Sequence, residues 1–312
     1  MSNLDALPGM TDVTRSHAVP EVFEPREVPL GGLRAMRVER VLPQRGLPTV
    51  GAWCFLDAFG PHDVRMRVLP HPHTGLQTVT WPLAGEIHHR DSLGSDVLVR
   101  PGQLNLMTAG RGVSHSEFSV SDGMLHGLQL WVALPVERAT MAPAFEQHVD
   151  LPVYGGVATV VLGTLGDVTS PATTHTPLVG ADVTVDGQVA LPLRPDHEHA
   201  VLAMTELTVA GIAVPRGRLL YLGTGRAEVV LAGSGRAFLL GGEPFPDDLV
   251  MWWNFVGRSH EEIVAARAAW AAADELFGTV AGHGGARIPA PDLPGVRLAP
   301  RRRRAAQPPE AQ

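Results

Sequence analysis

Short apolar runs separated by glycine and proline recur along most of the chain. Residues 37–59 alternate such runs with turn residues, residues 76–83 (LQTVTWPL) form a clear strand pattern, and residues 125–134 (LHGLQLWVAL) show the period of two that is typical of a strand. Turn signals return about every ten residues, as in a β-sandwich or barrel. The pattern predicts an all-β domain over residues 26–150, preceded by a flexible arm over residues 1–25.

A second stretch of short strands follows the first. Runs such as VATVVLG, ADVTVDGQVALPL, RLLYLG and RAFLLGG repeat the same rhythm between residues 155 and 242. The similarity lies in this rhythm and not in residue identities. It predicts a second β-domain of similar build over residues 151–250.

The pattern changes to a helical period near the C-terminus. Within residues 251–278, Ser259 precedes an alanine-rich stretch and Glu262 follows three positions later, the spacing of a capping box. We expect one helix from Ser259 to Phe277, ended by the glycine that follows. Its apolar stripe would consist of Ile263, Ala266, Trp270 and Leu276. Residues 279–312 are rich in Gly, Pro, Ala and Arg, which predicts a disordered tail.

Composition and charge narrow the class of protein. The 312 residues are 45% hydrophobic and 18% charged, with 34 Gly and 27 Pro, which favours a turn-rich globular protein. The net charge is −7, and each of the 25 basic residues is arginine. Because no broad basic surface is available, direct nucleic-acid binding is disfavoured. One basic run, Arg301–Arg304, fits either a solvated tail or a local contact for an anion.

Cysteine usage and apolar run length bear on location. Cys54 is the sole cysteine, so an intramolecular disulfide or a four-thiolate zinc or iron–sulfur site cannot form. No stretch approaches the roughly 18 uninterrupted apolar residues of a membrane span, and the N-terminus lacks the pattern of a signal peptide. We therefore expect a cytoplasmic protein that does not bind membranes.

Two histidine-containing triplets, HPH and HSE, carry the candidate chemistry. If both are extended, alternation places His71 and His73 on one face and His115 and Glu117 on one face. We expect the second triplet to meet the first from across the barrel, so that three imidazoles and a carboxylate converge on one metal ion. This donor set suits a first-row transition metal better than calcium or magnesium. Open positions on the metal would take water or substrate, as in a catalytic or sensing site.

Other interpretations stay open for single residues. His71 and His73 alone would also fit surface histidines in a proline-rich loop. Glu117 fits either a metal ligand or a base that takes a proton from a bound hydroxyl. Neighbours on a strand point to opposite faces, so at most one of His88 and His89 points inward.

Two further sets of histidines need a separate interpretation. His126 is expected to be a core residue or an outer partner of the metal ligands. In the second β-domain, His197 and His199 repeat the spacing of the first triplet, but no histidine occurs between residues 200 and 250. We therefore expect the second domain to hold no metal.

Four segments are long and specific: FLDAFGPH (residues 55–62), HPHTGLQTVTWPLAGEIHHRDSLG (71–94), PGQLNLMTAGRGVSHSE (101–117) and HGLQLWVALP (126–135). They resemble the pirin family of the cupin superfamily, and a weaker resemblance extends over about residues 30–277. The resemblance implies an all-β bicupin: two jelly-roll β-barrels packed face to face, with a C-terminal α-helix and disordered termini. It also implies one divalent metal, with Fe(II) expected and manganese, nickel or zinc open. The implied ligands are His71, His73, His115 and Glu117, and the C-terminal barrel would have lost its metal.

The chain departs from the family pattern at one position. Gln77 stands where pirins carry a glutamate, four residues beyond the second histidine of the first triplet. That glutamate resembles an outer partner of the ligands more than a ligand. An uncharged amide there should leave metal binding intact while altering metal preference or proton handling.

The resemblance implies an oxidoreductase of the quercetin 2,3-dioxygenase type, which opens the central ring of a flavonol with O₂ at a mononuclear metal. Glu117 would remove the hydroxyl proton, and Gln77 or His126 would orient it. The apolar wall for a flat aromatic substrate would come from Leu69, Trp81 and Trp131. The alternative is a non-enzymatic, iron-dependent redox-sensing regulator that acts through a protein partner. A site that has lost its function is a third possibility.

Overall fold

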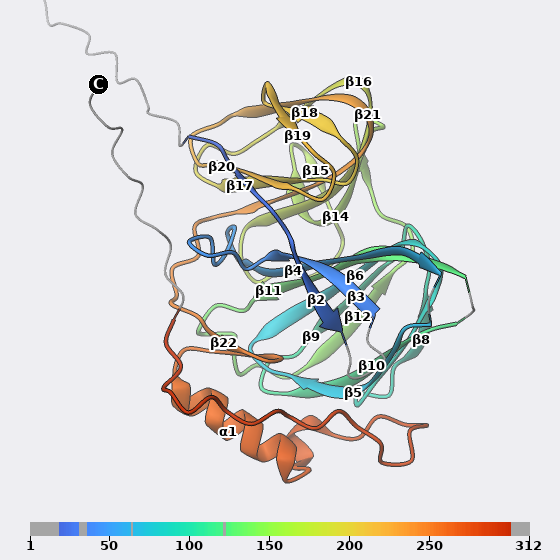
Figure 1. The fold of residues 1–312 in the computed structure, drawn as a ribbon, viewed down its shortest axis with the longest axis vertical. Coiled ribbons are helices and arrows are strands. Elements are labelled where there is room, and N and C mark those ends of the chain that lie inside the picture. The colour runs from blue at the N-terminus through green and yellow to red at the C-terminus, as the bar shows by residue number, and fades with distance from the viewer. Residues whose placement is uncertain (1–18, 31–35, 64, 121–122, 301–312) are drawn as a thin grey trace, which may run out of the picture.

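The computed structural model describes residues 19–30, 36–63, 65–120 and 123–300. Figure 1 shows two β-domains, one above the other, with a helix at the far end of the N-terminal domain. The expected all-β bicupin architecture is confirmed. The arginine run at 301–304 lies outside the described residues. Among the described residues, the helices fall short of the length and apolar content that a membrane-spanning helix requires.

The N-terminal domain is a sandwich of two antiparallel sheets. The larger sheet has the strand order β12-β9-β6-β11-β4-β3-β2, and the smaller has the order β5-β10-β7-β8. Their strands are β2 (Arg26–Leu30), β3 (Met36–Leu42), β4 (Trp53–Asp63), β5 (Arg67–His73), β6 (Leu76–Ala84), β7 (Ile87–Asp91), β8 (Asp96–Val99), β9 (Leu104–Thr108), β10 (Val113–Ser119), β11 (Met124–Ala133) and β12 (Ala144–His148).

The C-terminal domain is built around one long antiparallel pair of strands that are distant in sequence. Strands β16 and β21 pair over their full length, and the main sheet has the order β1-β20-β17-β21-β16-β14-β13. Its strands are β13 (Val153–Tyr154), β14 (Ala158–Leu165), β15 (Val168–Thr169), β16 (Leu178–Pro192), β17 (Glu198–Ala203), β18 (Leu207–Val209), β19 (Ile212–Val214), β20 (Leu219–Gly223) and β21 (Glu228–Gly242).

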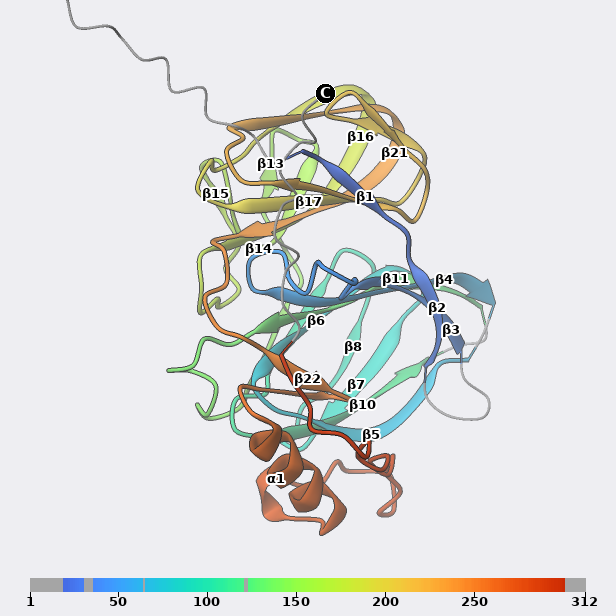
Figure 2. The same ribbon diagram turned by 60° about the vertical axis from the view of Figure 1, so that its left-hand side comes forward.

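The end of the expected N-terminal arm is held in a sheet. Strand β1 (Glu21–Phe23) pairs with β20 of the C-terminal domain, and the chain then crosses to β2 in the N-terminal domain (Figure 2). The prediction of a loose arm is therefore wrong for residues 21–23, because their backbone groups complete the edge of a sheet. Residues 1–18 lie outside the described part of the chain.

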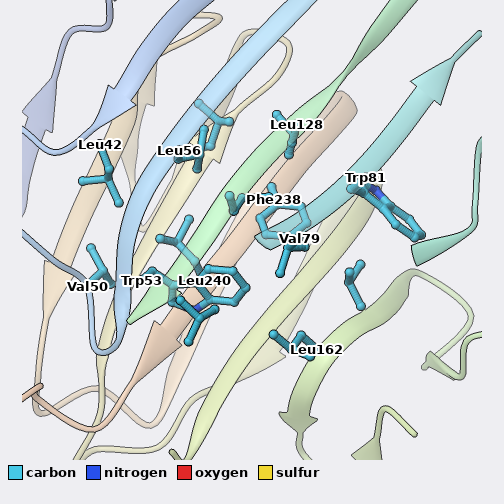
Figure 3. Close-up of a cluster of buried hydrophobic side chains, with 14 of the residues drawn as sticks. Leu42, Val50, Trp53, Leu56, Val79, Trp81, Leu128, Leu162, Phe238 and Leu240 are labelled. Carbon is cyan, nitrogen blue, oxygen red and sulfur yellow. The ribbon is translucent and has the colours of Figure 1, made fainter. Parts of the chain in front are cut away.

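An apolar core joins the two domains face to face. Trp53 and Leu128 of the N-terminal domain pack with Phe238 and Leu240 of the C-terminal domain (Figure 3). The Trp53 indole Nε1 lies 3.1 Å from Val179 O and 3.2 Å from Gly241 O, so its single donor is satisfied across the interface. The large sheet therefore has a buried outer face, and the inner face remains for the cavity between the two sheets.

The C-terminal helix is shorter than the sequence predicts. After β22 (Val250–Trp252) and β23 (Phe255–Gly257), α1 spans His260–Ala271 and a separate 3₁₀ turn, η1, spans Glu275–Phe277. Ala273 interrupts the helix at a φ of 57°, and Asp274 Oδ1 accepts a hydrogen bond from Leu276 N to begin the turn. As a result Phe277 is buried in place of Leu276, which is exposed.

The expected N-cap of this helix is confirmed. Ser259 Oγ accepts a hydrogen bond from Glu262 N at 3.2 Å. The Glu262 carboxylate accepts from Arg258 N at 3.0 Å, one residue before the position expected for a capping box.

The segment 279–300 is packed against the N-terminal domain, and the prediction of disorder is wrong for it. Ile288 N donates to Pro70 O at 2.8 Å, and the Trp270 indole Nε1 donates to Ile288 O at 2.9 Å. Val280 is buried, and Leu293 and Leu298 pack against the cluster that contains Trp270. Apolar side chains spaced along this proline-rich segment pack against the protein, although the segment has no regular secondary structure.

Candidate metal centre

The two triplets lie on neighbouring strands of the smaller sheet. Strands β5 and β10 pair antiparallel, with His71 opposite His115 and His73 opposite Val113. The expectation that the second triplet would approach from across the barrel is therefore wrong. Direct pairing brings imidazoles from the same face of two adjacent strands close together, since opposed residues are about 5 Å apart.

Three imidazoles form one group. The ring nitrogens of His71, His73 and His115 include a set that lies within 4.8 Å of one another, and His73 Nε2 is 3.1 Å from His115 Nε2. The Nδ1 of His71 lies 2.9 Å from Leu69 O, and because a carbonyl only accepts, this Nδ1 carries the hydrogen. The neutral His71 ring then has its lone pair on Nε2, the atom that remains for a ligand.

Burial keeps this group in the form that binds metals. Removal from water lowers the pKa of His71 to about 4 and lowers the pKa of His73 and His115 well below the ordinary value. Neighbouring imidazoles act in the same direction. The two Nε2 atoms 3.1 Å apart fit a shared cation; without one, either ring must carry its hydrogen on Nε2 and donate it to the other.

Glu117 belongs to a second, overlapping group. Its carboxylate, one nitrogen of His115 and one nitrogen of His89 lie within 4.8 Å of one another. The register of β10 against β5 shifts between His115 and Glu117, so that Glu117 lies opposite Val68 of β5. His115 is thus common to both groups. Ligation of one ion by all four expected residues stays a prediction.

The Glu117 carboxyl is buried and supported from the opposite sheet. Burial raises its pKa, while His89 and the hydrogen bond from Thr80 act to lower it. Thr80 Oγ1 lies 2.8 Å from Glu117 Oε1 and 3.1 Å from Gln129 Oε1. One hydroxyl hydrogen serves one of these acceptors at a time.

A cavity of about 380 Å³ opens next to these residues. Its walls include Phe55 and Trp131, whose rings stack at a centroid distance of 3.9 Å and an interplanar angle of 12°. The Arg40 guanidinium lies 4.4 Å from the Phe55 centroid and forms two 2.8 Å hydrogen bonds with Asp57. The volume of the cavity falls within the range of pockets that hold organic ligands.

Two residues expected to orient Glu117 have other contacts. Gln77 Nε2 donates to Thr108 Oγ1 at 2.9 Å and to Thr173 O at 3.1 Å, on the side of β6 that faces the C-terminal domain. His126 is half-buried, and its pKa is lowered by burial and by the charges of Arg216 and Arg236. Thr80 and Gln129 lie beside Glu117 instead, on the inner face of the large sheet.

The expected apolar wall is correct in part. Trp131 lines the cavity. Trp81 is buried between the domains, where its Nε1 donates to Asp182 Oδ2 at 2.6 Å, so its assignment to the wall is wrong. Leu69 contributes its backbone carbonyl to His71. Phe55, Phe59 and Ile288 are wall residues that the sequence did not indicate.

A buried pair, His89 and Asp91, lies behind His115. His89 Nδ1 is 3.4 Å from His115 Nδ1, and His89 Nε2 is 3.2 Å from Asp91 Oδ2. The prediction that at most one of His88 and His89 points inward is confirmed, since His89 is buried and His88 is half-buried and bonded to Asp96. The signal for Asp91 was its position two residues after His89 on one strand.

In the C-terminal domain, Asp196, His197 and Glu243 form another group of possible ligands. Asp196 and Glu243 are exposed, and Asp196 is paired with Arg194 at 2.8 Å. His199, the other histidine of the repeated spacing, is not part of this group. The expectation that this domain holds no metal stays a prediction.

Two stacked β-domains, with a histidine-rich group inside the first, define the chain as a bicupin with a candidate metal centre. The family model named Pirin matches residues 35–132, and the model of the pirin C-terminal cupin domain matches residues 179–275. The chain belongs to the pirin family.

Relatives of similar length support this assignment. A Pseudomonas aeruginosa protein with a provisional quercetin 2,3-dioxygenase name is 41% identical over 91% of this chain and 96% of its own length. A pirin-like protein of Caulobacter vibrioides is 35% identical over 80% of this chain and 92% of its own length. The crystal structure of a quercetin 2,3-dioxygenase from Acinetobacter baumannii superposes with a TM-score of 0.83 at 40% identity, covering 89% of this chain and 97% of that one.

Proposed function

We propose that this pirin is a dioxygenase of the quercetin 2,3-dioxygenase type that holds one divalent transition metal, expected to be Fe(II). The ligands would be the imidazoles of His71, His73 and His115 and the carboxylate of Glu117. The observation that carries the proposal is the group of three neutral, buried imidazoles at a cavity that Glu117 also lines. The similarity to proteins named as quercetin 2,3-dioxygenases supports it.

The bound metal would supply the redox-active centre at which a flavonol and O₂ meet. The protein residues bind and orient the flavonol. The stacked pair Phe55 and Trp131 gives the cavity an apolar wall that suits an aromatic ligand. Arg40, fixed by its two bonds to Asp57, gives the cavity a polar wall that suits phenolic oxygens.

Glu117 would take the proton of the flavonol hydroxyl. Burial raises the pKa of this carboxyl, which makes the carboxylate a better proton acceptor than an exposed one. Thr80 donates a hydrogen bond to Oε1, which helps to fix the orientation of the carboxylate. The apolar surroundings keep bulk water away from this transfer.

The activity is tested directly on metal-loaded protein. Purified protein is loaded anaerobically with Fe(II), mixed with quercetin and exposed to air, and loss of the flavonol is followed together with release of carbon monoxide. We expect turnover, and loss of both metal and turnover in His71→Ala. His88→Ala is the matched control, because His88 is a half-buried histidine outside both groups. Fully loaded protein without turnover contradicts the enzymatic proposal.

Glu117→Gln tests the base separately. The amide keeps the size of the side chain and removes its basicity, so kcat should fall by about 10²–10⁴-fold. Metal content is measured on the same samples. Normal metal content with undiminished turnover shows that Glu117 is not the base.

A second candidate is a redox-sensing regulator that acts through a protein partner. The observation that favours it is the direct bonding of the C-terminal segment to residues beside the proposed ligands. Ile288 N donates to Pro70 O, Ser114 Oγ donates to Phe277 O at 2.9 Å, and Ser116 Oγ lies 2.9 Å from His283 Nε2. Hydrogen exchange of residues 279–300 in Fe(II) and Fe(III) protein tests it: equal protection in both states removes this candidate.

A further inference from the structure

We infer that Asp91 and His89 are positioning residues that fix the tautomer of His115, so that its Nε2 lone pair faces His71 and His73. The inference rests on the proposed metal site and is independent of the proposed reaction. It concerns a chain of three side chains, Asp91, His89 and His115, on the paired strands β7 and β10.

Strand pairing builds this chain. Strands β7 and β10 are antiparallel neighbours, with Asp91 opposite His115 and His89 opposite Glu117. Side chains two apart share a face of a strand, so His89 and Asp91 lie on the same side of the sheet as the proposed ligands. His89, Asp91 and His115 are each at most 2% exposed. His115 lines the cavity, and His89 lies behind it.

The Asp91 carboxylate, at the end of this series of side chains that lies farthest from the cavity, is fixed by hydrogen bonds. Its Oδ1 accepts hydrogen bonds from Leu93 N and Ser95 N, each at 2.9 Å, and its Oδ2 faces His89 Nε2 at 3.2 Å. Burial acts to raise the pKa of Asp91, but the hydrogen bonds with His89 and Ser95 hold it below its usual value. The carboxylate therefore serves only as an acceptor.

The positions of the hydrogens follow from this acceptor. Because Asp91 only accepts, His89 carries a hydrogen on Nε2. With the single hydrogen of the His115 ring on Nδ1, His89 Nδ1 at 3.4 Å is its acceptor. The lone pair of the neutral His115 ring is left on Nε2, the atom 3.1 Å from His73 Nε2.

The plane of the His89 ring is also fixed. Phe145 of β12 stacks on it, with centroids 4.6 Å apart and an interplanar angle of 21°. A ring held on its face by Phe145 and on one edge by Asp91 presents Nδ1 in one direction. Outer hydrogen-bond partners of this kind orient a metal-binding histidine and make it more basic, and their loss costs about 10–100-fold in metal affinity.

The overlapping group of His89, His115 and Glu117 offers a competing role for His89, that of a ligand. The two roles demand different nitrogens of His115. If His115 binds the metal together with His71 and His73, it uses Nε2 and keeps a hydrogen on Nδ1. If His89 itself bound the ion, an asparagine in its place would not restore the site.

Two substitutions at one position separate these roles. In His89→Asn, the amide oxygen takes the approximate place of Nδ1 and still accepts from His115. In His89→Leu, the volume is similar and the acceptor is gone. Zinc(II) affinity of metal-free protein is measured by competition with a chelator. We expect about a 10–100-fold loss for His89→Leu and recovery of most of it for His89→Asn.

The tautomer itself is read by long-range ¹H–¹⁵N NMR on metal-free protein labelled at histidine. Wild type and His89→Asn should show His115 with its hydrogen on Nδ1, and His89→Leu should show a mixture. Unchanged zinc affinity or an unchanged His115 tautomer in His89→Leu overturns the inference. An equal loss of affinity in the Asn and Leu variants also overturns it, in favour of His89 as a ligand.

A milder variant covers the case in which His89→Leu fails to fold. Asp91→Asn keeps the side-chain size but can donate to His89 Nε2 as well as accept from it, so the His115 tautomer should become mixed. A pure Nδ1–H tautomer in this variant overturns the inference. His71→Ala is measured in parallel: unchanged zinc affinity there contradicts the metal site itself and is distinguishable from a failure of the positioning role.

Discussion

Burial has the same effect on histidines at both ends of the molecule. It lowers the pKa of His71, beside the cavity, to about 4, and it lowers the pKa of His199, in the C-terminal domain, to about 4 as well. Both rings are neutral at pH 7. In the N-terminal domain the neutral form is the one that can bind a metal, whereas in the C-terminal domain we expect it to make the fold sensitive to acid.

His199 should make the stability of metal-free protein depend on pH. The unfolded chain takes up a proton near pH 6.5 and the folded chain only near pH 4, so the unfolded state binds more protons between these values and stability falls as the pH is lowered. The full shift corresponds to about 3 kcal/mol. Urea unfolding of wild type and His199→Leu at pH 7 and pH 4.5 should show a smaller loss in the variant. An equal loss in both proteins would mean that His199 is protonated as easily when folded.

Gln77 can be tested by substitution with the glutamate that the sequence resemblance implies for this position. Its amide donates to Thr173 O, and a carboxylate would lack this donor and bury a charge between the domains. Gln77→Glu should therefore lower the free energy of unfolding by about 1–3 kcal/mol and leave zinc affinity unchanged. Gln129→Glu is the control on the cavity side and should change metal binding. Altered zinc affinity in Gln77→Glu would connect position 77 to the metal site.

At the scale of elements, the strands of the site could be predicted but their partners could not. Two-residue spacing along β5 and β10 placed His71, His73, His115 and Glu117 on shared faces. The pairing of β5 with β10, and of β10 with β7, depends on contacts between distant segments. The pattern of apolar and polar residues does not specify which residues of these strands lie opposite each other. His89 and Asp91 were therefore missed as a pair, and Gln77, expected to orient Glu117, instead bonds to Thr108 and Thr173.

The helix shows a similar limit. Its start could be predicted because the N-cap Ser259 and Glu262 are close in sequence, at the spacing of a capping box. Its early end did not, because Ala272 and Ala273 have high helix propensity and the break serves the burial of Phe277 beside Phe255 and Trp270. Packing against the N-terminal domain overrides propensity here.

The Ser259 cap can be measured by substitution. Ser259→Ala removes the acceptor for Glu262 N, and the free energy of unfolding should fall by about 1 kcal/mol. Ser259→Asp retains an acceptor and adds negative charge at the helix N-terminus, so it should keep the stability of wild type. Denaturant titrations of the three proteins provide the comparison. If the alanine and aspartate variants are equally stable, the cap contributes nothing measurable.

At the scale of the whole molecule, the chain returns to the N-terminal domain after completing the C-terminal one. Hairpin β22–β23 bonds back to the end of β5 through Val256 N and Thr74 O, and α1 and the segment 279–300 follow on the same side (Figure 1). Trp253, Asn254 and Ile288 line the cavity. The pocket is thus completed by residues from the far end of the sequence.

Removal of the segment after Gly278 should open this pocket without removing a proposed ligand. The truncated protein loses Ile288 from the cavity wall and the packing of Val280 near Trp270, which should lower the free energy of unfolding by about 3 kcal/mol. Zinc affinity should stay within a few-fold of wild type, because strands β5 and β10 are intact. A flavonol enlarged by one sugar should bind more tightly relative to quercetin, as measured by tryptophan fluorescence. Ile288→Ala should shift this preference in the same direction with little loss of stability, and truncation after Pro300 should not. An unchanged preference in both the long truncation and Ile288→Ala would show that the C-terminal segment does not limit the cavity.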